Sequence, residues 1–171
     1  MLLKKTLVAA AIFAVAGFAT VAGATTQSAQ FHVKIAITNT CDVTSLTAGD
    51  MDFGSHTYLD SNINSTSTIQ IKCTNGNNFH IGLDSGINAA TPGDIATRRM
   101  KSTTTPTAFV SYQLYTDSAH STPWGNTSTD GWVAASGTGS LQNFTVYGQA
   151  TPTSSAVAGS YDDTVTATVT F

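Results

Sequence analysis

The chain has 171 residues, of which only 10% are charged, and its formal net charge is −3. This is the length of a single domain. The sequence has no basic stripe, which argues against a nucleic-acid partner.

The first residues have the pattern of a secretory signal peptide. Lys4 and Lys5 precede an apolar run over Leu7–Val21, and the small residues Ala22 to Ala24 form a cleavage site. A membrane anchor is the alternative, but the run is short for a spanning helix and small residues follow it instead of charges. We therefore expect residues 1–24 to be removed during export.

The stretch that follows alternates in polarity. In residues 29–41, "AQFHVKIAITNTC", every second residue from Phe31 to Ile37 is apolar. This period is typical of a half-buried β-strand, so the sequence predicts a strand over Phe31–Thr38. The strand belongs either to the protein's own sheet or to a sheet of another molecule.

The chain has two cysteines, Cys41 and Cys73. An exported chain meets an oxidising compartment, so a single disulfide is expected. Closing this long loop contributes roughly 3–4 kcal/mol in the chain-entropy model. Two cysteines this far apart, without a neighbouring ligand motif, are a poor metal site. We expect no cofactor.

Beyond Cys41, apolar residues recur with period two and turn-forming residues interrupt them, while no stretch predicts a helix. A polar loop is expected over residues 58–67. The expected strands are a short one near Met51–Gly54, then Ser67–Cys73, Phe79–Asp84, Arg98–Ser102, Ala108–Asp117, 131–136, Ser140–Ala150 and Ser160–Phe171. Many short strands without helices predict an all-β, immunoglobulin-like sandwich.

No cluster of titratable residues has a catalytic pattern. Asp162 and Asp163 are neighbours on a predicted strand, so they point to opposite faces, and we interpret them as part of a turn into the last strand. The histidines are scattered and no nucleophile motif accompanies them. The sequence thus gives no reason to expect an enzyme. The histidines are His32, His56, His80 and His120.

Two further groups have competing interpretations. The basic cluster Arg98–Met100 could hold an anion, but a solvated strand or loop face is favoured. Four aromatic residues could form a sugar-binding platform, but alternating aromatics in a sandwich strand are more often core. These residues are Tyr112, Tyr115, Trp124 and Trp132.

Several stretches together resemble one family. An alternating strand runs into "CDV", and "DFG", "IQIKC", "SYQLYTDSAHSTPWG", "FTVYGQATP" and "AGSYDDTVTATVTF" follow in order. This order resembles the spore coat protein U domain family, which includes the pilins of archaic, Csu-type chaperone–usher pili. The most specific stretches are Tyr112–Gly125 and Gly159–Phe171.

The resemblance implies an immunoglobulin-like sandwich that lacks its final strand and so has a hydrophobic groove. In such pilins a periplasmic chaperone lends a strand to the groove, and at the outer-membrane usher the amino-terminal segment of the next subunit replaces it. The implied organisation is a signal peptide over 1–24, a donor-strand segment over 25–40 and a pilin domain over 41–171.

The resemblance also implies roles for individual residues. Thr38–Thr40 are either a linker or the end of the donated strand. In an isolated chain, the donor segment is expected to fold back into the chain's own groove. The donor residues would be Phe31, Val33, Ile35 and Ile37, and the groove wall would be Val165, Ala167, Val169 and Phe171.

The implied function is that of a structural subunit of a surface pilus that supports adhesion and biofilm formation. Its partners would be a periplasmic chaperone, an outer-membrane usher and other copies of itself or sister pilins. The alternative is a secreted binding module of the same fold, such as a tip adhesin or a coat-like protein.

Overall fold

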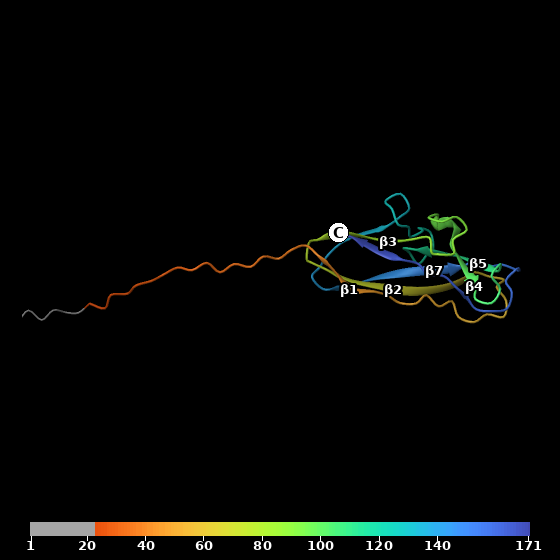
Figure 1. The fold of residues 1–171 in the computed structure, drawn as a ribbon, viewed down its shortest axis with the longest axis horizontal. Helices are drawn as coiled ribbons and strands as arrows, with labels where there is room; N and C mark the ends of the chain where they lie inside the picture. Colours follow the sequence, from red (N-terminus) through yellow and green to blue (C-terminus); the bar gives the residue numbers. More distant parts are fainter. Residues whose placement is uncertain (1–22) are drawn as a thin grey trace, which may run out of the picture. The chain divides into compact units, whose positions relative to one another are not determined.

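The computed structural model describes residues 23–171, and for residues 43–47 it describes the backbone alone. The expected signal peptide therefore lies almost wholly outside the described residues. The chain divides into two units, Met1–Ala36 and Ile37–Phe171. Within the first unit, residues 23–36 form neither helix nor strand (Figure 1).

The second unit is a sandwich of two antiparallel sheets. The larger sheet has the strand order β1-β2-β7-β5-β4-β8, and the smaller sheet has the order β6-β3-β9. In Figure 1, β3 lies in one layer, and β1, β2 and β7 lie in the other. The strands are β1 (Cys41–Ala48), β2 (Ile63–Cys73), β3 (Asn78–Leu83), β4 (Arg99–Ser102), β5 (Phe109–Tyr115), β6 (Val133–Ser136), β7 (Leu141–Ala150), β8 (Tyr161–Asp162) and β9 (Ala167–Thr170). A single 3-10 turn, η1 (Ile95–Thr97), is the one helical element of the described residues.

The core lies between the sheets and follows the period-two pattern of the sequence. Val110, Tyr112 and Leu114 are buried along β5, as their alternation predicts. Across the core, the rings of Phe79 and Phe144 meet edge to face with centroids 5.9 Å apart. The all-β sandwich is therefore confirmed.

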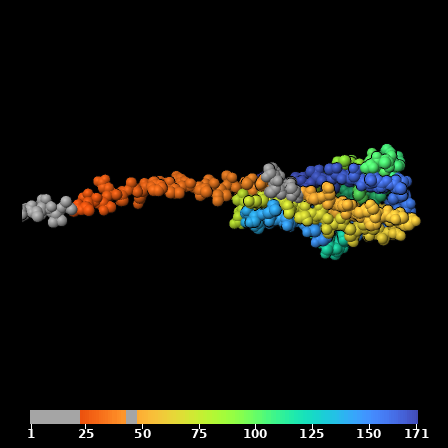
Figure 2. Space-filling view, turned by 90° about the horizontal axis from the view of Figure 1, so that it is seen from below, coloured from red at the N-terminus to blue at the C-terminus, as the bar shows by residue number. Residues whose placement is uncertain are grey.

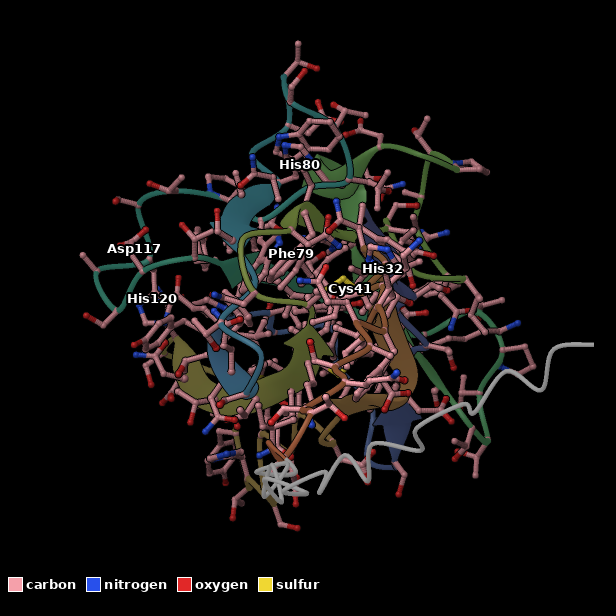
Figure 3. The ribbon with its side chains drawn as sticks, turned by 90° about the vertical axis from the view of Figure 1, so that its left-hand side faces the viewer. His32, Cys41, Phe79, His80, Asp117 and His120 are labelled. Carbon is pink, nitrogen blue, oxygen red and sulfur yellow. A yellow bond between two sulfur atoms is a disulfide. The ribbon has the colours of Figure 1, made fainter. Side chains whose placement is uncertain are left out.

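The predicted disulfide is present between Cys41 and Cys73, which are directly paired in the β1–β2 ladder. Cys41 and Phe79, both labelled in Figure 3, belong to the buried core. The bond thus joins the first residue of β1 to the last residue of β2.

Two expectations about strand positions were wrong. The strand β2 begins at Ile63 rather than Ser67, because its pairing with β7 extends to Ile63 opposite Ala150. Residues 51–54 form no strand, although Met51 and Phe53 still pack against the core.

The expected strand over Phe31–Thr38 is also not formed. Residues 31–38 carry no strand assignment, and the side chains of Phe31, Val33, Ile35 and Ile37 are 78–89% exposed. A β-strand requires a paired neighbour, so alternation alone did not produce one here. Residues 31–36 belong to a different unit from the sandwich, so the expected fold-back into the chain's own groove stays a prediction.

The last predicted strand is divided between the two sheets. β8 pairs with β4 in the larger sheet, and β9 pairs with β3 in the smaller one. The chain between β8 and β9 crosses from one sheet to the other. Asp84 forms two hydrogen bonds with Thr166, which lies in this connecting segment. The Asp84 amide donates to the Thr166 carbonyl at 3.1 Å, and the Asp84 carboxylate accepts from the Thr166 amide at 2.9 Å.

Candidate functional site: a groove between two strand edges

Two strand edges lack a neighbouring strand where the sheets face each other. Among the described residues, β1 pairs only with β2, and β9 pairs only with β3. Figure 2 shows the last strand, in dark blue, running beside residues 48–54, in orange, on one face of the body. Backbone groups on such edges are available to another strand.

A cavity of about 450 Å³ lies between these edges. Ile69, Leu114 and Val146 form part of its floor, and Met51 and Phe53 form one wall. Val165 and Ala167 form part of the opposite wall. The lining at these positions is apolar, so it suits aliphatic and aromatic side chains.

A second cavity of about 200 Å³ lies at the end that carries the disulfide. Cys41 and Ile71 line it from the larger sheet, while Val169 and Phe171 line it from the smaller sheet's side. Ala167 lines both cavities, so the two adjoin and form one groove. We call this feature the edge groove.

The residues expected to form a groove wall lie in this place. Along residues 165–170 the apolar side chains are half-buried, and the intervening threonines are exposed. Phe171, at the end, is 56% exposed. The structure thus brings Val165, Ala167, Val169 and Phe171 together along the edge groove. The donor residues lie in the other unit except Ile37, the first residue of the second unit.

The opposite wall was missed by sequence reasoning. Met51 and Phe53 belong to "MDFG", which was interpreted as a short strand of the sheet. Gly148 makes their position possible, because a Cβ atom there would lie 2.5 Å from the Met51 sulfur and 3.1 Å from the Phe53 ring. The alternation of Met51 and Phe53 was the available signal, and it indicated burial rather than pairing.

A hydrogen-bonded phenol lies at one end of the larger cavity. Tyr112 donates its hydroxyl to Asp163 at 2.7 Å, and Asn88 donates its backbone and side-chain N–H groups to the same carboxylate, each at 3.0 Å. Burial raises the pKa of Tyr112 far above its ordinary value, and the bond to Asp163 raises it further. The phenol therefore remains a neutral donor near neutral pH. As predicted, the neighbouring carboxylates point to opposite faces, and Asp162 is exposed.

Arg98 is buried, so the interpretation of residues 98–100 as a solvated face was wrong for this residue. Its Nη2 group donates to the carbonyls of Leu83 and Trp124, each at 2.9 Å, and its Nε donates to the carbonyl of Asp84 at 2.9 Å. Desolvation lowers the pKa of the guanidinium. Arg98 satisfies buried carbonyls that the sandwich would otherwise leave without donors.

The four aromatic residues do not form a common platform. Trp124 is core and donates its indole N–H to the Ile81 carbonyl at 2.9 Å. Trp132 stacks on His80 with centroids 4.2 Å apart, and Tyr115 meets His120 edge to face at 5.2 Å. In Figure 3, His120 and Asp117 lie together on a loop at the periphery.

Within residues 23–171, no group of three or more histidine, cysteine or acidic side chains is arranged to hold a metal ion. None of the helical elements described is long and apolar enough to cross a membrane.

Comparison with known proteins gives consistent results. The sequence profile of the Spore Coat Protein U domain family matches residues 27–168. The chain is 31% identical over 159 residues to Protein U of Myxococcus xanthus, with 88% of each protein covered. It also resembles a chain of the CsuC–CsuE chaperone–tip adhesion subunit pre-assembly complex from archaic chaperone–usher Csu pili of Acinetobacter baumannii. That match has a TM-score of 0.58 and 22% identity, and it covers 79% of this chain and 40% of the other. The match to the Csu complex shows a similar fold. The match to the family profile is a match of sequence, and it shows that the chain belongs to the Spore Coat Protein U domain family.

Proposed function

We propose that the protein is a structural subunit of a chaperone–usher pilus, in which the amino-terminal segment of one copy fills the edge groove of the next. The observation that carries this proposal is the groove itself, a trough with an apolar floor that is flanked by two edges that pair with no further strand among the described residues. The same chain carries an exposed segment with four alternating apolar side chains, which has the chemistry to fill it.

The energetics support a stable contact. Burying an aliphatic or aromatic side chain contributes roughly 1.5–3 kcal/mol, so Phe31, Val33, Ile35 and Ile37 together would contribute about 6–12 kcal/mol before ordering costs. An inserted strand would also pair with β1 and β9. A contact in which a segment of one copy enters the groove of another does not close on itself, so it extends into a filament.

Before assembly, the exposed groove and its strand edges need to be covered by another protein. An open apolar groove with free strand edges promotes aggregation, and a lent strand would protect it. We infer a periplasmic chaperone for this role and an outer-membrane usher for the exchange. The fold relative supports this inference, because it comes from a complex described as a chaperone with a pilus subunit. The assembled fibre would lie at the cell surface and serve adhesion and biofilm formation.

Two variants of the donor segment test the proposal. Ile35→Asp places a carboxylate among the side chains proposed to enter the groove, whereas Ala36→Asp places the same charge on the opposite phase of the strand. Expressed with the chaperone and usher, Ile35→Asp is expected to abolish surface fibres in electron micrographs, and Ala36→Asp is expected to retain them. Normal fibres from Ile35→Asp would overturn the role of this segment.

The family description favours one second candidate, a secreted coat-like protein of the same fold. In that function the groove would not need to accept a copy of the chain. The assembly state distinguishes the two candidates. A pilus subunit forms linear fibres, and these are expected to be lost when Ile35 is replaced by aspartate. A coat-like protein would reach the surface equally well with either substitution.

A further inference from the structure

Thr74 contacts the short stretch that separates the amino-terminal segment from the disulfide. Its hydroxyl accepts a hydrogen bond from the Thr40 amide at 3.2 Å. The same hydroxyl lies 3.1 Å from the Thr38 carbonyl and 3.2 Å from the Thr40 carbonyl, within donating distance of both. All of these contacts lie within the unit Ile37–Phe171.

The Thr74 side chain adds hydrogen bonds to those that a simple continuation of the β1–β2 ladder would form. The ladder itself accounts for one bond, in which the Thr74 amide donates to the Thr40 carbonyl at 2.9 Å. The side-chain bonds to the Thr40 amide and the Thr38 carbonyl are additional. Residues 38–40 are exposed, so without Thr74 their backbone groups would bond to water.

The backbone that carries the hydroxyl is itself held in place. Cys73, the preceding residue, is linked to Cys41, and the Thr74 carbonyl accepts from the Asn77 amide at 3.0 Å. A Cβ atom at Gly137 would collide with the Thr74 carbonyl, so the backbone at Gly137 packs directly against this corner. The hydroxyl therefore projects from a fixed support.

We propose that Thr74 fastens residues 38–40 to the body, so that the donor segment hinges ahead of Thr38 rather than at Cys41. Residues 38–40 would then be part of the body, neither linker nor donated strand. If these three residues were not fastened, they would act as an extended linker of about 10 Å between a donated strand and the body of the same chain. The consequence for fibres rests on the proposed function, but the fastening itself does not.

Amide hydrogen exchange on the full mature chain tests the fastening without requiring polymerisation. Thr74→Val removes the hydroxyl and keeps the branched shape, and Thr74→Ser restores the hydroxyl. Loss of one net hydrogen bond predicts that the Thr40 amide exchanges roughly five- to tenfold faster in the valine variant. The Thr74→Ser chain should exchange at the wild-type rate, and the amide of residue 74 should keep its protection in all three chains.

An unchanged Thr40 exchange rate in Thr74→Val would overturn the proposal. If valine disturbs the corner, seen as lost protection of the residue 74 amide, Thr74→Ala provides the same readout without the branched side chain. Faster Thr40 exchange in a chain whose wild type assembles no fibres would refute the proposed function and leave the fastening intact.

Where fibres form, a second measurement follows. Micrographs of Thr74→Val fibres should show a wider distribution of angles between successive subunits than wild-type or Thr74→Ser fibres. Equal distributions would show that residues 38–40 are held by other contacts in the fibre and would overturn the hinge assignment.

Discussion

Tyr112 couples the fold to pH through its bond to Asp163. The folded state raises the pKa of this phenol, whereas a tyrosine in an unfolded chain titrates near pH 10. The unfolded chain therefore loses its proton first as the pH rises. The stabilisation from the neutral phenol is fully present below about pH 10 and declines above it, by at most about 1.4 kcal/mol per pH unit.

Tyr112→Phe should remove this dependence. We expect the free energy of unfolding of the variant to fall less steeply than that of the wild type between pH 10 and pH 11.5 in urea titrations. At pH 7 the variant should be less stable by about 1–2 kcal/mol, because Asp163 loses a donor. Tyr58→Phe is the matched control, since Tyr58 is 78% exposed. Identical slopes in the Tyr112→Phe and wild-type chains would contradict this account.

The sequence predicts the environment of some residues better than that of others. Burial of Val110 and Leu114 follows from alternation, which is a local pattern that any strand with one buried face shows. The buried role of Arg98 does not follow from any local pattern. The carbonyls that accept its hydrogen bonds belong to Leu83 in β3, to Asp84 and to Trp124. Only the tertiary structure brings these segments together, so a basic cluster in the sequence indicated a solvated face.

The disulfide is a constraint on two elements, since it closes the loop from β1 to the end of β2. Reducing the wild-type chain should lower its free energy of unfolding by about 3 kcal/mol. Urea titrations with and without dithiothreitol measure this difference. The double variant Cys41→Ala/Cys73→Ala should show no effect of the reductant. A reductant effect of equal size in that variant would assign the loss to something other than the disulfide.

At the level of elements, alternation predicted most of the strands, but it did not predict which strands pair, and Phe31–Thr38 and residues 51–54 alternate without forming a strand. The alternation over residues 160–171 continues through the crossing between sheets, because Val165 remains inward while its backbone belongs to neither strand. The pattern therefore predicted one strand where the structure has β8 and β9. For the edge groove, the family resemblance implies a wall at Val165, Ala167, Val169 and Phe171; these residues line the two cavities, and their role as an acceptor stays a prediction. The wall made by Met51 and Phe53 depends on space above Gly148, which no local pattern records.

At the scale of the whole molecule, the proposed function requires that a strand can enter the edge groove, and a peptide copying the donor segment should therefore bind there. Under the proposed function, a chain carrying Ile35→Asp retains the groove but has a defective donor segment. A synthetic peptide of residues 29–38 is expected to raise its melting temperature by about 5–10 °C at 100 times the dissociation constant. The measurement is thermal denaturation across a peptide titration.

The peptide controls use the same pair of positions as the fibre assay. A peptide with Ala36→Asp should stabilise the chain as well as the wild-type peptide does, and a peptide with Ile35→Asp should not. Equal stabilisation by both would mean that the peptide acts without placing residue 35 in the edge groove.

The location of the disulfide has a mechanical consequence. A pull on the amino-terminal segment first meets the hydrogen bonds between Thr74 and residues 38–40, and then Cys41, whose covalent bond transmits the force to the end of β2. That strand is eleven residues long and lies between β1 and β7. The load is thus carried by a long interior strand, and β1, at the edge of the sheet, is spared from being peeled away residue by residue.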